Sequence, residues 1–179
     1  MILYLTKQTF ERFNLTPPEL MRSPVKEITE EVKKREQGNR LLEWGGKLLY
    51  FDRRKCIQFT NFASKFTVFL IDVKVKDLQY LGDGIFQYLI DFYKNNGEMT
   101  ALIERLAKEH PFVVIDRLKD KSIISTLNRT QLTFAEDGYR FYDFIENNIL
   151  QSKKINRKLN SDWLFTQKVE GKSEPEYFY

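Results

Sequence analysis

The sequence predicts a single α+β domain over residues 1–179, with a mainly antiparallel sheet and helices packed against it. Three observations predict this class. Residues 47–71 contain three consecutive stretches with the two-residue period of strands, separated by short polar reversals, which is typical of an antiparallel three-stranded meander. Residues 85–109 then show the helical period. A chain of 179 residues with 42% hydrophobic side chains is long enough to bury one core without disulfides or metals.

The N-terminal part of the chain predicts a strand and a charged helix. Residues 2–5 are short and apolar, so we expect them to extend the sheet. Residues 24–38 begin with proline directly after Ser23, a typical N-cap residue, and end at Gly38. The apolar stripe of this helix is narrow, so we expect the helix to pack weakly and to protrude from the body.

The middle of the chain supplies the centre of the sheet and its cover. Residues 66–71 are apolar at almost every position, so we expect a central strand that is covered on both faces. Apolar side chains at helical spacing predict two covering helices, one ending at Asn96-Gly97 and one ending at His110. Residues 111–116 predict a further strand, with proline at its first position.

The helical period returns at Ser122 and continues to about residue 150. We expect two helices there, broken near Gly138, rather than one long helix. Residues 151–179 then form a basic segment followed by a short strand and an aromatic tail, "EPEYFY". The rings of this tail either dock on the body as an added strand or stay exposed for a protein partner.

Composition and charge set broad limits on function. The 29 basic and 25 acidic side chains leave a formal charge of +4, which is too small to identify a polyanionic partner by itself. The lone cysteine, Cys56, cannot form an internal disulfide, so a reducing compartment is expected and the cytoplasm is the default location. The sequence contains no apolar run of the length of a membrane span, so we expect no membrane partner.

Several kinds of site lack the residues that they need. A structural zinc ion needs four Cys or His ligands, and the sequence has only Cys56 and His110. We interpret the cysteine as an inert buried thiol and the histidine as a structural residue at a helix end. Gly45-Gly46 and the Gly82–Gly84 segment lack the pattern of a phosphate loop, and turn or helix-start geometry explains them. We therefore expect no cofactor and no metal.

Carboxylates are the remaining route to an enzyme. Asp72 and Asp116 each close a predicted strand, and three later acids could approach them to form a magnesium site for a phosphoryl hydrolase or nuclease. Acids at strand ends are usually turn residues that accept hydrogen bonds from nearby backbone groups, and we favour that interpretation. The three later acids are Glu136, Asp137 and Asp143.

Basic segments suggest a binding surface instead. If residues 153–158 are helical, their cations share one face while Ile155 and Leu159 occupy the other. Such cations can contact phosphates without reading bases, and Trp163 and Phe165 lie nearby for stacking. Solvated charges that protect a sheet edge explain these segments as well, and the modest net charge favours that explanation. The candidate nucleic-acid contacts are Arg53, Arg54, Lys55, Lys153, Lys154, Arg157 and Lys158, with Lys33, Lys34 and Arg35 as a further basic run.

Three segments, "WGGKLLYFDRRKCIQFTN", "FLIDVKVKDL" and "SIISTLNRT", resemble a family of uncharacterised bacterial proteins known only as a domain of unknown function. Relatives of that family occur beside or fused to plasmid-borne and mobile-element passenger domains. The resemblance implies a bacterial, cytosolic origin and a compact α+β fold. It transfers no catalytic residue, because the family has no established activity.

The sequence therefore predicts a non-catalytic binding or accessory module of the bacterial cytosol, whose partner is nucleic acid or another protein. Two alternatives stay open at this stage. One is the metal-assisted hydrolase with Asp72 and Asp116, and the other is a protein-interaction subunit that uses its aromatic tail.

Overall fold

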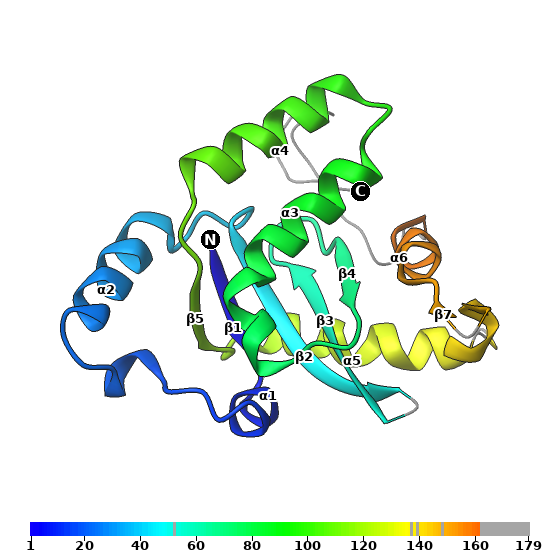
Figure 1. The fold of residues 1–179 in the computed structure, drawn as a ribbon, viewed down its shortest axis with the longest axis horizontal. Coiled ribbons are helices and arrows are strands. Elements are labelled where there is room, and N and C mark those ends of the chain that lie inside the picture. The colour runs from blue at the N-terminus through cyan, green and yellow to red at the C-terminus, as the bar shows by residue number, and fades with distance from the viewer. Residues whose placement is uncertain (52, 137, 139, 148, 162–179) are drawn as a thin grey trace.

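The fold is organised around one sheet. The computed structural model describes residues 1–51, 53–136, 138, 140–147 and 149–161. Within these residues a five-stranded sheet has the order β4-β3-β2-β1-β5 (Figure 1). Its strands are β1 (Ile2–Leu5), β2 (Glu43–Phe51), β3 (Arg54–Asn61), β4 (Thr67–Leu70) and β5 (Val114–Arg117).

The sheet is mixed, so the prediction of a mainly antiparallel sheet is wrong. β2 pairs antiparallel with β3, and β3 pairs antiparallel with β4, but β1 is parallel to both β2 and β5. Four of these five strands therefore run in one direction and β3 alone opposes them. The expected three-stranded meander is not confirmed as a separate unit, because its strands are part of this mixed sheet.

The parallel pairings follow from the helical connections between the strands. Parallel neighbours need a crossover, which is usually helical. The chain passes through α1, η1 and α2 between the neighbours β1 and β2. It passes through η2, α3 and α4 between β4 and β5, which run in the same direction at opposite edges of the sheet, and β5 thereby pairs parallel with β1. These elements are α1 (Lys7–Arg12), η1 (Pro18–Leu20), α2 (Val25–Glu36), η2 (Val75–Tyr80), α3 (Leu81–Phe92) and α4 (Gly97–Glu109).

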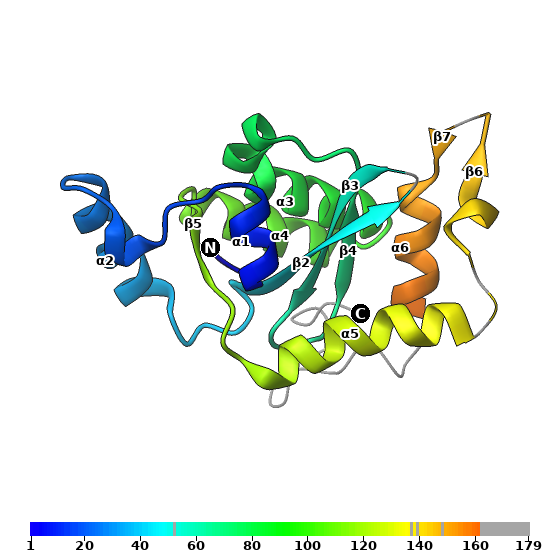
Figure 2. The same ribbon diagram turned by 90° about the horizontal axis from the view of Figure 1, so that it is seen from below.

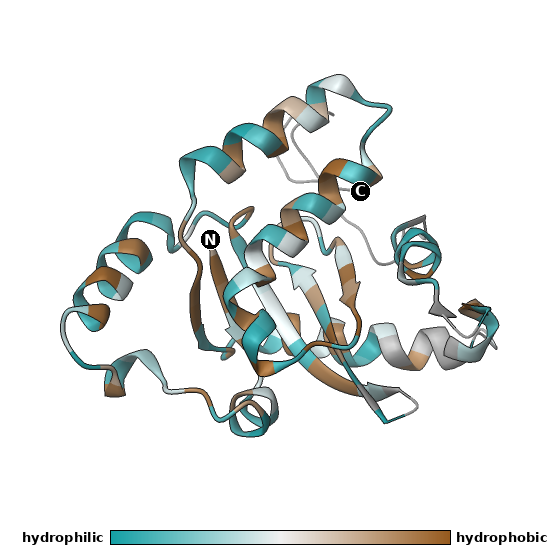
Figure 3. Ribbon diagram, in the orientation of Figure 1, coloured by the Kyte–Doolittle hydropathy of each residue, from teal (hydrophilic) through white to brown (hydrophobic). Residues whose placement is uncertain are grey.

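Helices cover both faces of the sheet (Figure 2). α1, α3 and α4 pack on one face through the main core, where Phe59 and Ile85 are fully buried. α5 (Lys121–Glu136) and α6 (Ser152–Ser161) lie on the other face, where they form two smaller clusters around Ile123 and Ile155. In Figure 3 the strands carry much of the apolar colour, whereas α6 is mainly hydrophilic. None of the described helices is both long and apolar enough to cross a membrane.

Gly45 and Gly46 lie inside β2, so their interpretation as turn residues is wrong. A Cβ atom on Gly45 would lie 2.2 Å from Cγ2 of Ile123 in α5. A Cβ atom on Gly46 would lie 2.5 Å from Cδ2 of Leu5 and 2.6 Å from Cε1 of Phe59. The two glycines therefore allow close packing on both faces of the sheet at the same point of β2.

β4 is an edge strand, which corrects the prediction of a central strand for residues 66–71. Both of its faces are nevertheless covered, because Val68 points into the main core and Phe69 packs against α6. A strand of this kind carries the apolar sequence of a central strand at the edge of the sheet. The run of apolar residues therefore indicates that both faces of the strand are covered, but it does not indicate the position of the strand in the sheet.

Two asparagines of α6 close the free edge of β4. Asn160 accepts from the Thr67 N–H at 2.7 Å and donates to its carbonyl at 2.6 Å. Asn156 accepts from the Phe69 N–H at 2.6 Å and donates to its carbonyl at 3.3 Å. Four residues of helix rise about 6.0 Å and two residues of strand about 6.6 Å. Because these lengths are similar, each asparagine amide reaches the outward-facing N–H and C=O of one β4 residue.

α2 lies at one end of the molecule, beside β5 (Figure 1). It begins at Val25 with Pro24 in the N-cap position, so the prediction of Ser23 as the N-cap is wrong. Its packing is limited: Val32 is buried, whereas Val25 and Ile28 are 56% and 52% exposed. The core contacts of this helix are therefore concentrated in its C-terminal half.

The second of the two helices predicted after Ser122 does not form. α5 ends at Glu136, Gly138 has a φ of 77°, and the chain continues as a short helical turn, η3 (Phe141–Phe144), and a two-stranded ribbon. The ribbon consists of β6 (Ile145–Glu146) and β7 (Ile149–Leu150). The strand and aromatic tail predicted for residues 162–179, including Trp163 and Phe165, lie outside the described residues.

Asn160→Ala should lower the free energy of unfolding by roughly 1–3 kcal/mol, because it leaves the outward N–H and C=O groups of Thr67 without their partner. Urea denaturation measures this loss. Gln87→Ala, on the exposed side of α3, is the matched control and should change stability little. Equal effects of the two substitutions would show that the edge of β4 does not depend on α6.

Gly45→Ala should destabilise the protein by roughly 1–3 kcal/mol, because the added methyl group overlaps Ile123. Gly97→Ala is the control: a Cβ at this position meets nothing within 4 Å, so stability should be unchanged or slightly raised. Thermal unfolding of both variants measures the difference. A stable Gly45→Ala variant would contradict the close approach of α5 to β2.

Candidate functional site

The two strand-end carboxylates lie at opposite edges of the sheet. Asp72 follows β4 and Asp116 lies in β5, and four strand steps separate these strands. At about 4.8 Å per step the two strands are about 19 Å apart. The structure therefore does not bring Asp72 and Asp116 together, and they cannot hold a common metal ion.

Asp116 has a structural environment of its own. Its carboxylate contacts the Lys33 ammonium group at 2.5 Å and accepts the Arg117 backbone N–H at 2.7 Å. Asp143 accepts the backbone N–H of Arg140 at 2.7 Å, as expected of an acid in a turn. No three His, Cys, Asp or Glu side chains among the described residues are grouped closely enough to hold a metal ion. Asp137 lies outside those residues.

His110 and Cys56 occupy structural positions. His110 is the C-cap of α4, and its Nδ1 lies 3.2 Å from Oε1 of the fully buried Glu36. Glu36 also contacts the Met1 ammonium group and, at 2.7 Å, the Arg35 guanidinium group. Cys56 is buried in the small cluster under α6. The interpretation of Cys56 as a buried thiol is confirmed.

Glu36 is an ionised group inside the protein. Burial alone would raise the pKa of its carboxyl, but hydrogen bonds from the Met1 ammonium group, Arg35 and His110 outweigh this effect and hold the pKa below its usual value. The cluster joins α2, the start of β1 and the end of α4. Its role is to hold these three segments together.

α6 presents a cationic surface. Its Ile155 and Leu159 are buried, and the prediction that the cations share the opposite side is confirmed. Because the two asparagines of α6 also hydrogen-bond to β4, one side of the helix is fixed to the sheet and the other side faces solvent. The exposed cations of α6 are Lys153, Lys154, Arg157 and Lys158.

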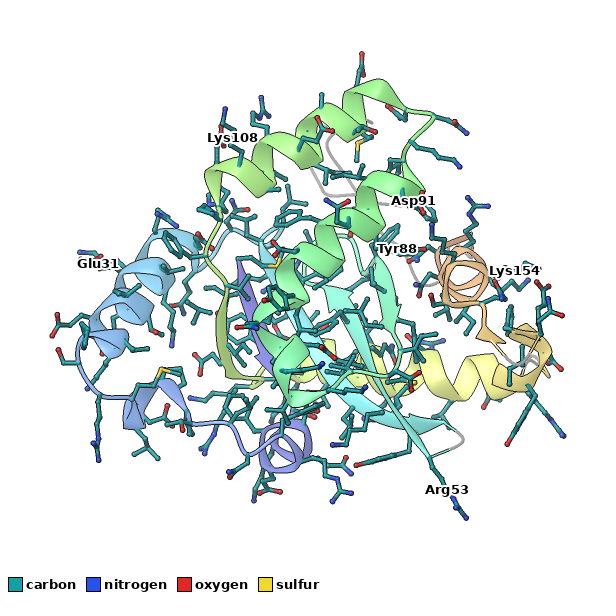
Figure 4. All side chains as sticks on the ribbon, viewed as in Figure 1. Glu31, Arg53, Tyr88, Asp91, Lys108 and Lys154 are labelled. Atoms are coloured by element: carbon teal, nitrogen blue, oxygen red, sulfur yellow. The ribbon has the colours of Figure 1, made fainter. Side chains whose placement is uncertain are left out.

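Lys153 and Lys154 have carboxylate neighbours at the surface. Lys153 pairs with Asp91 at the end of α3, and Lys154 pairs with Glu146 in β6. The Lys153 ammonium group lowers the pKa of the Asp91 carboxyl. In Figure 4 Asp91 lies between α3 and α6, and Lys154 points away from α3. All four side chains in these pairs are more than a third exposed, so the pairs contribute little to stability.

The second basic segment forms the reversal between β2 and β3. Phe51 pairs with Arg54 across the hairpin, and Arg53, within the reversal, adopts a φ of 63°. Arg53 is exposed and points away from the body (Figure 4). Lys55 lies over the Phe13 ring at 5.1 Å. The structure does not describe the Arg54 side chain, so its contact role stays a prediction.

Two residues beside this reversal were not identified from the sequence. Tyr50 lies opposite Lys55 across the hairpin and is 48% exposed. Arg12 of α1 donates from Nε to the Tyr50 hydroxyl, and its guanidinium carbon lies 5.6 Å from the centre of the ring. The strand period could have placed Tyr50 and Lys55 on one face, but nothing in the sequence places α1 beside them.

The basic segments do not all converge. The β2–β3 reversal and α6 lie toward the same end of the long axis, whereas α2, with Lys33, Lys34 and Arg35, lies at the other end (Figures 1 and 2). The cations of α2 are also partly used inside the protein, because Lys33 pairs with Asp116 and Arg35 with Glu36. α2 is therefore not part of the candidate surface.

The fold and this surface define a mixed α/β domain with a cationic helix fixed to the edge of its sheet. Residues 2–178 match the family described as Domain of unknown function (DUF6933), and the chain belongs to this family. The predicted resemblance to an uncharacterised domain family is confirmed to that extent. Comparisons with curated proteins and with solved structures found no match.

The Glu36 cluster should make stability depend on acid pH. Because its pKa is lowered in the folded state, Glu36 stabilises the protein above its ordinary pKa, and this contribution is lost as the pH falls through the lowered pKa. Glu36→Gln should cost roughly 3–5 kcal/mol at pH 7, since the buried Met1 ammonium group, which also donates to the Phe112 carbonyl, loses its carboxylate partner. The difference between the variant and the wild type should narrow toward pH 3.

Chemical denaturation between pH 3 and pH 7 measures this difference. Glu30→Gln is the control, because Glu30 is an exposed acid on the same helix, 3.9 Å from Lys26. The control should show a small and nearly pH-independent effect. If Glu36→Gln lowers the free energy of unfolding by the same amount at every pH, the charge of Glu36 does not stabilise the cluster.

Proposed function

We propose that this domain is a non-catalytic binding module that contacts the phosphate backbone of a nucleic acid through α6 and the β2–β3 reversal. The observation that carries the proposal is the two-sided character of α6. One side is hydrogen-bonded to the edge of β4, and the other exposes Lys153, Lys154, Arg157 and Lys158. A bacterial cytosolic location is part of the proposal.

The fixed position of α6 supports binding rather than simple solvation. A cation on a flexible segment loses conformational freedom when it binds a partner, whereas the backbone of a docked helix is already ordered. The two asparagines and the buried Ile155 and Leu159 hold this helix against the sheet. The conformational entropy that is lost on binding then comes mainly from the ordering of the long side chains.

The surface ion pairs do not oppose this role. Lys153 and Lys154 exchange a solvated carboxylate for a phosphate when a polyanion binds, and exposed pairs of this kind are weak. The exposed Arg53 at the β2–β3 reversal adds positive charge at the same end of the molecule. Contacts of this kind give affinity without base specificity.

The test is a binding titration with mixed-sequence DNA and RNA at several salt concentrations. We expect affinity at low salt that falls steeply as salt rises, because bound phosphates release counterions. Arg157→Gln combined with Lys158→Gln should weaken binding to all sequences and lower the slope of log affinity against log salt by roughly 1–2. Absence of binding at low salt would contradict the proposal.

The matched control removes one lysine and one arginine from exposed positions on other helices. Lys34→Gln combined with Arg105→Gln changes the net charge equally but acts on α2 and α4. This control should leave the salt slope unchanged. If both double variants weaken binding to the same degree, the effect comes from total charge and not from α6.

A further inference from the structure

We propose that the pocket between α1 and β2 binds one unstacked base of a single-stranded nucleic acid, with Tyr50 as the stacking residue. This inference rests on the proposed function and adds to it the class of ligand. It predicts that the partner is single-stranded, because a base within a duplex is stacked between its neighbours and cannot enter a pocket.

The pocket has the size and the lining for a planar polar ring. Its volume is about 390 Å³, within the range of small-molecule sites. The buried Leu48 supplies an apolar floor, and Tyr50 supplies an aromatic wall. Gln8 and Glu11 line the polar side, where an amide and a carboxylate can pair with donors and acceptors on a base edge.

Tyr50 is held in position before any ligand binds. Arg12 donates to its hydroxyl, and the guanidinium group of Arg12 lies near the ring. The backbone of Tyr50 is fixed in the β2–β3 ladder opposite Lys55. A stacking residue that is already oriented loses little conformational freedom when a base packs on it.

α1 is fixed to β2 directly below the pocket. Thr9 accepts the backbone N–H of Leu48 through its hydroxyl at 2.9 Å, and Thr9 is fully buried. Gln8 and Arg12 are therefore attached to a helix with a defined position relative to Tyr50. The two walls of the pocket are parts of one rigid unit.

Cations for the adjoining phosphates lie next to the pocket. Lys55 is the cross-strand neighbour of Tyr50, and side chains in such pairs are about 5 Å apart. Arg53 extends from the hairpin two residues before Lys55. Glu11 carries the opposing charge, and the Lys7 ammonium group lies 3.7 Å from its carboxylate. A base in the pocket therefore has positive charge on the side of the β2–β3 reversal.

Fluorescence anisotropy with a labelled single-stranded oligonucleotide and with its duplex tests this inference. Tyr50→Ala should weaken single-strand binding roughly 5- to 100-fold, the usual effect of removing a stacking residue. Tyr50→Phe should retain most of the affinity, because the ring remains. Tyr80→Ala and Tyr142→Ala, which remove tyrosines that are 60% and 63% exposed elsewhere, should leave affinity unchanged.

A second measurement does not depend on any variant. Ultraviolet crosslinking of the wild-type protein to a single-stranded oligonucleotide, followed by peptide mass spectrometry, should place the crosslink on the β2 peptide that contains Tyr50. The salt slope of Tyr50→Ala should equal that of the wild type, because stacking releases no counterions.

The outcomes separate this inference from the proposed function. Binding that prefers single strands and depends on the Tyr50 ring supports both. Binding that is unaffected by Tyr50→Ala, or equally tight for the duplex, overturns the base pocket and leaves the backbone contacts in place. Absence of binding to either probe at low salt overturns both.

Discussion

The pairing of α6 with the edge of β4 is the interaction on which the arrangement of this domain depends. An unprotected edge strand exposes backbone donors and acceptors to other chains. Here Asn156 and Asn160 take the place of a neighbouring strand, and each satisfies both backbone groups of one β4 residue. The helix thereby gains a fixed position although it buries few apolar side chains. Its cationic side is oriented by the same contacts.

The opposite end of the sheet is held in a different way. β5 is bordered by α2, where Lys33 contacts Asp116 and the buried Glu36 joins Met1, Arg35 and His110. Charged groups therefore stabilise this end, whereas neutral amides close the β4 edge. The difference matters for function, because Lys33 and Arg35 of α2 contact acids that hold the fold together, whereas the cations of α6 lie at the surface.

The sequence predicted what periodicity and composition can report. The amphipathic helix around Ile155 and the helices after β4 follow from the spacing of apolar residues. Strand direction and order do not follow from that spacing, so the mixed sheet and the edge position of β4 were missed. Gly45 is a further example. The residue must be glycine because Ile123 packs against it, and the sequence does not show that Ile123, which is distant along the chain, lies there. Tyr50 was missed because α1 completes its pocket.

The most direct test of the central claim is residue-level amide hydrogen exchange at the outer edge of β4. If α6 closes this edge, the Thr67 and Phe69 amide hydrogens should exchange as slowly as those in the interior of β3. Exchange of these two amides as fast as that of exposed loop residues would show that α6 is not docked there. This result would also contradict the claim that the cationic surface of α6 has a fixed position.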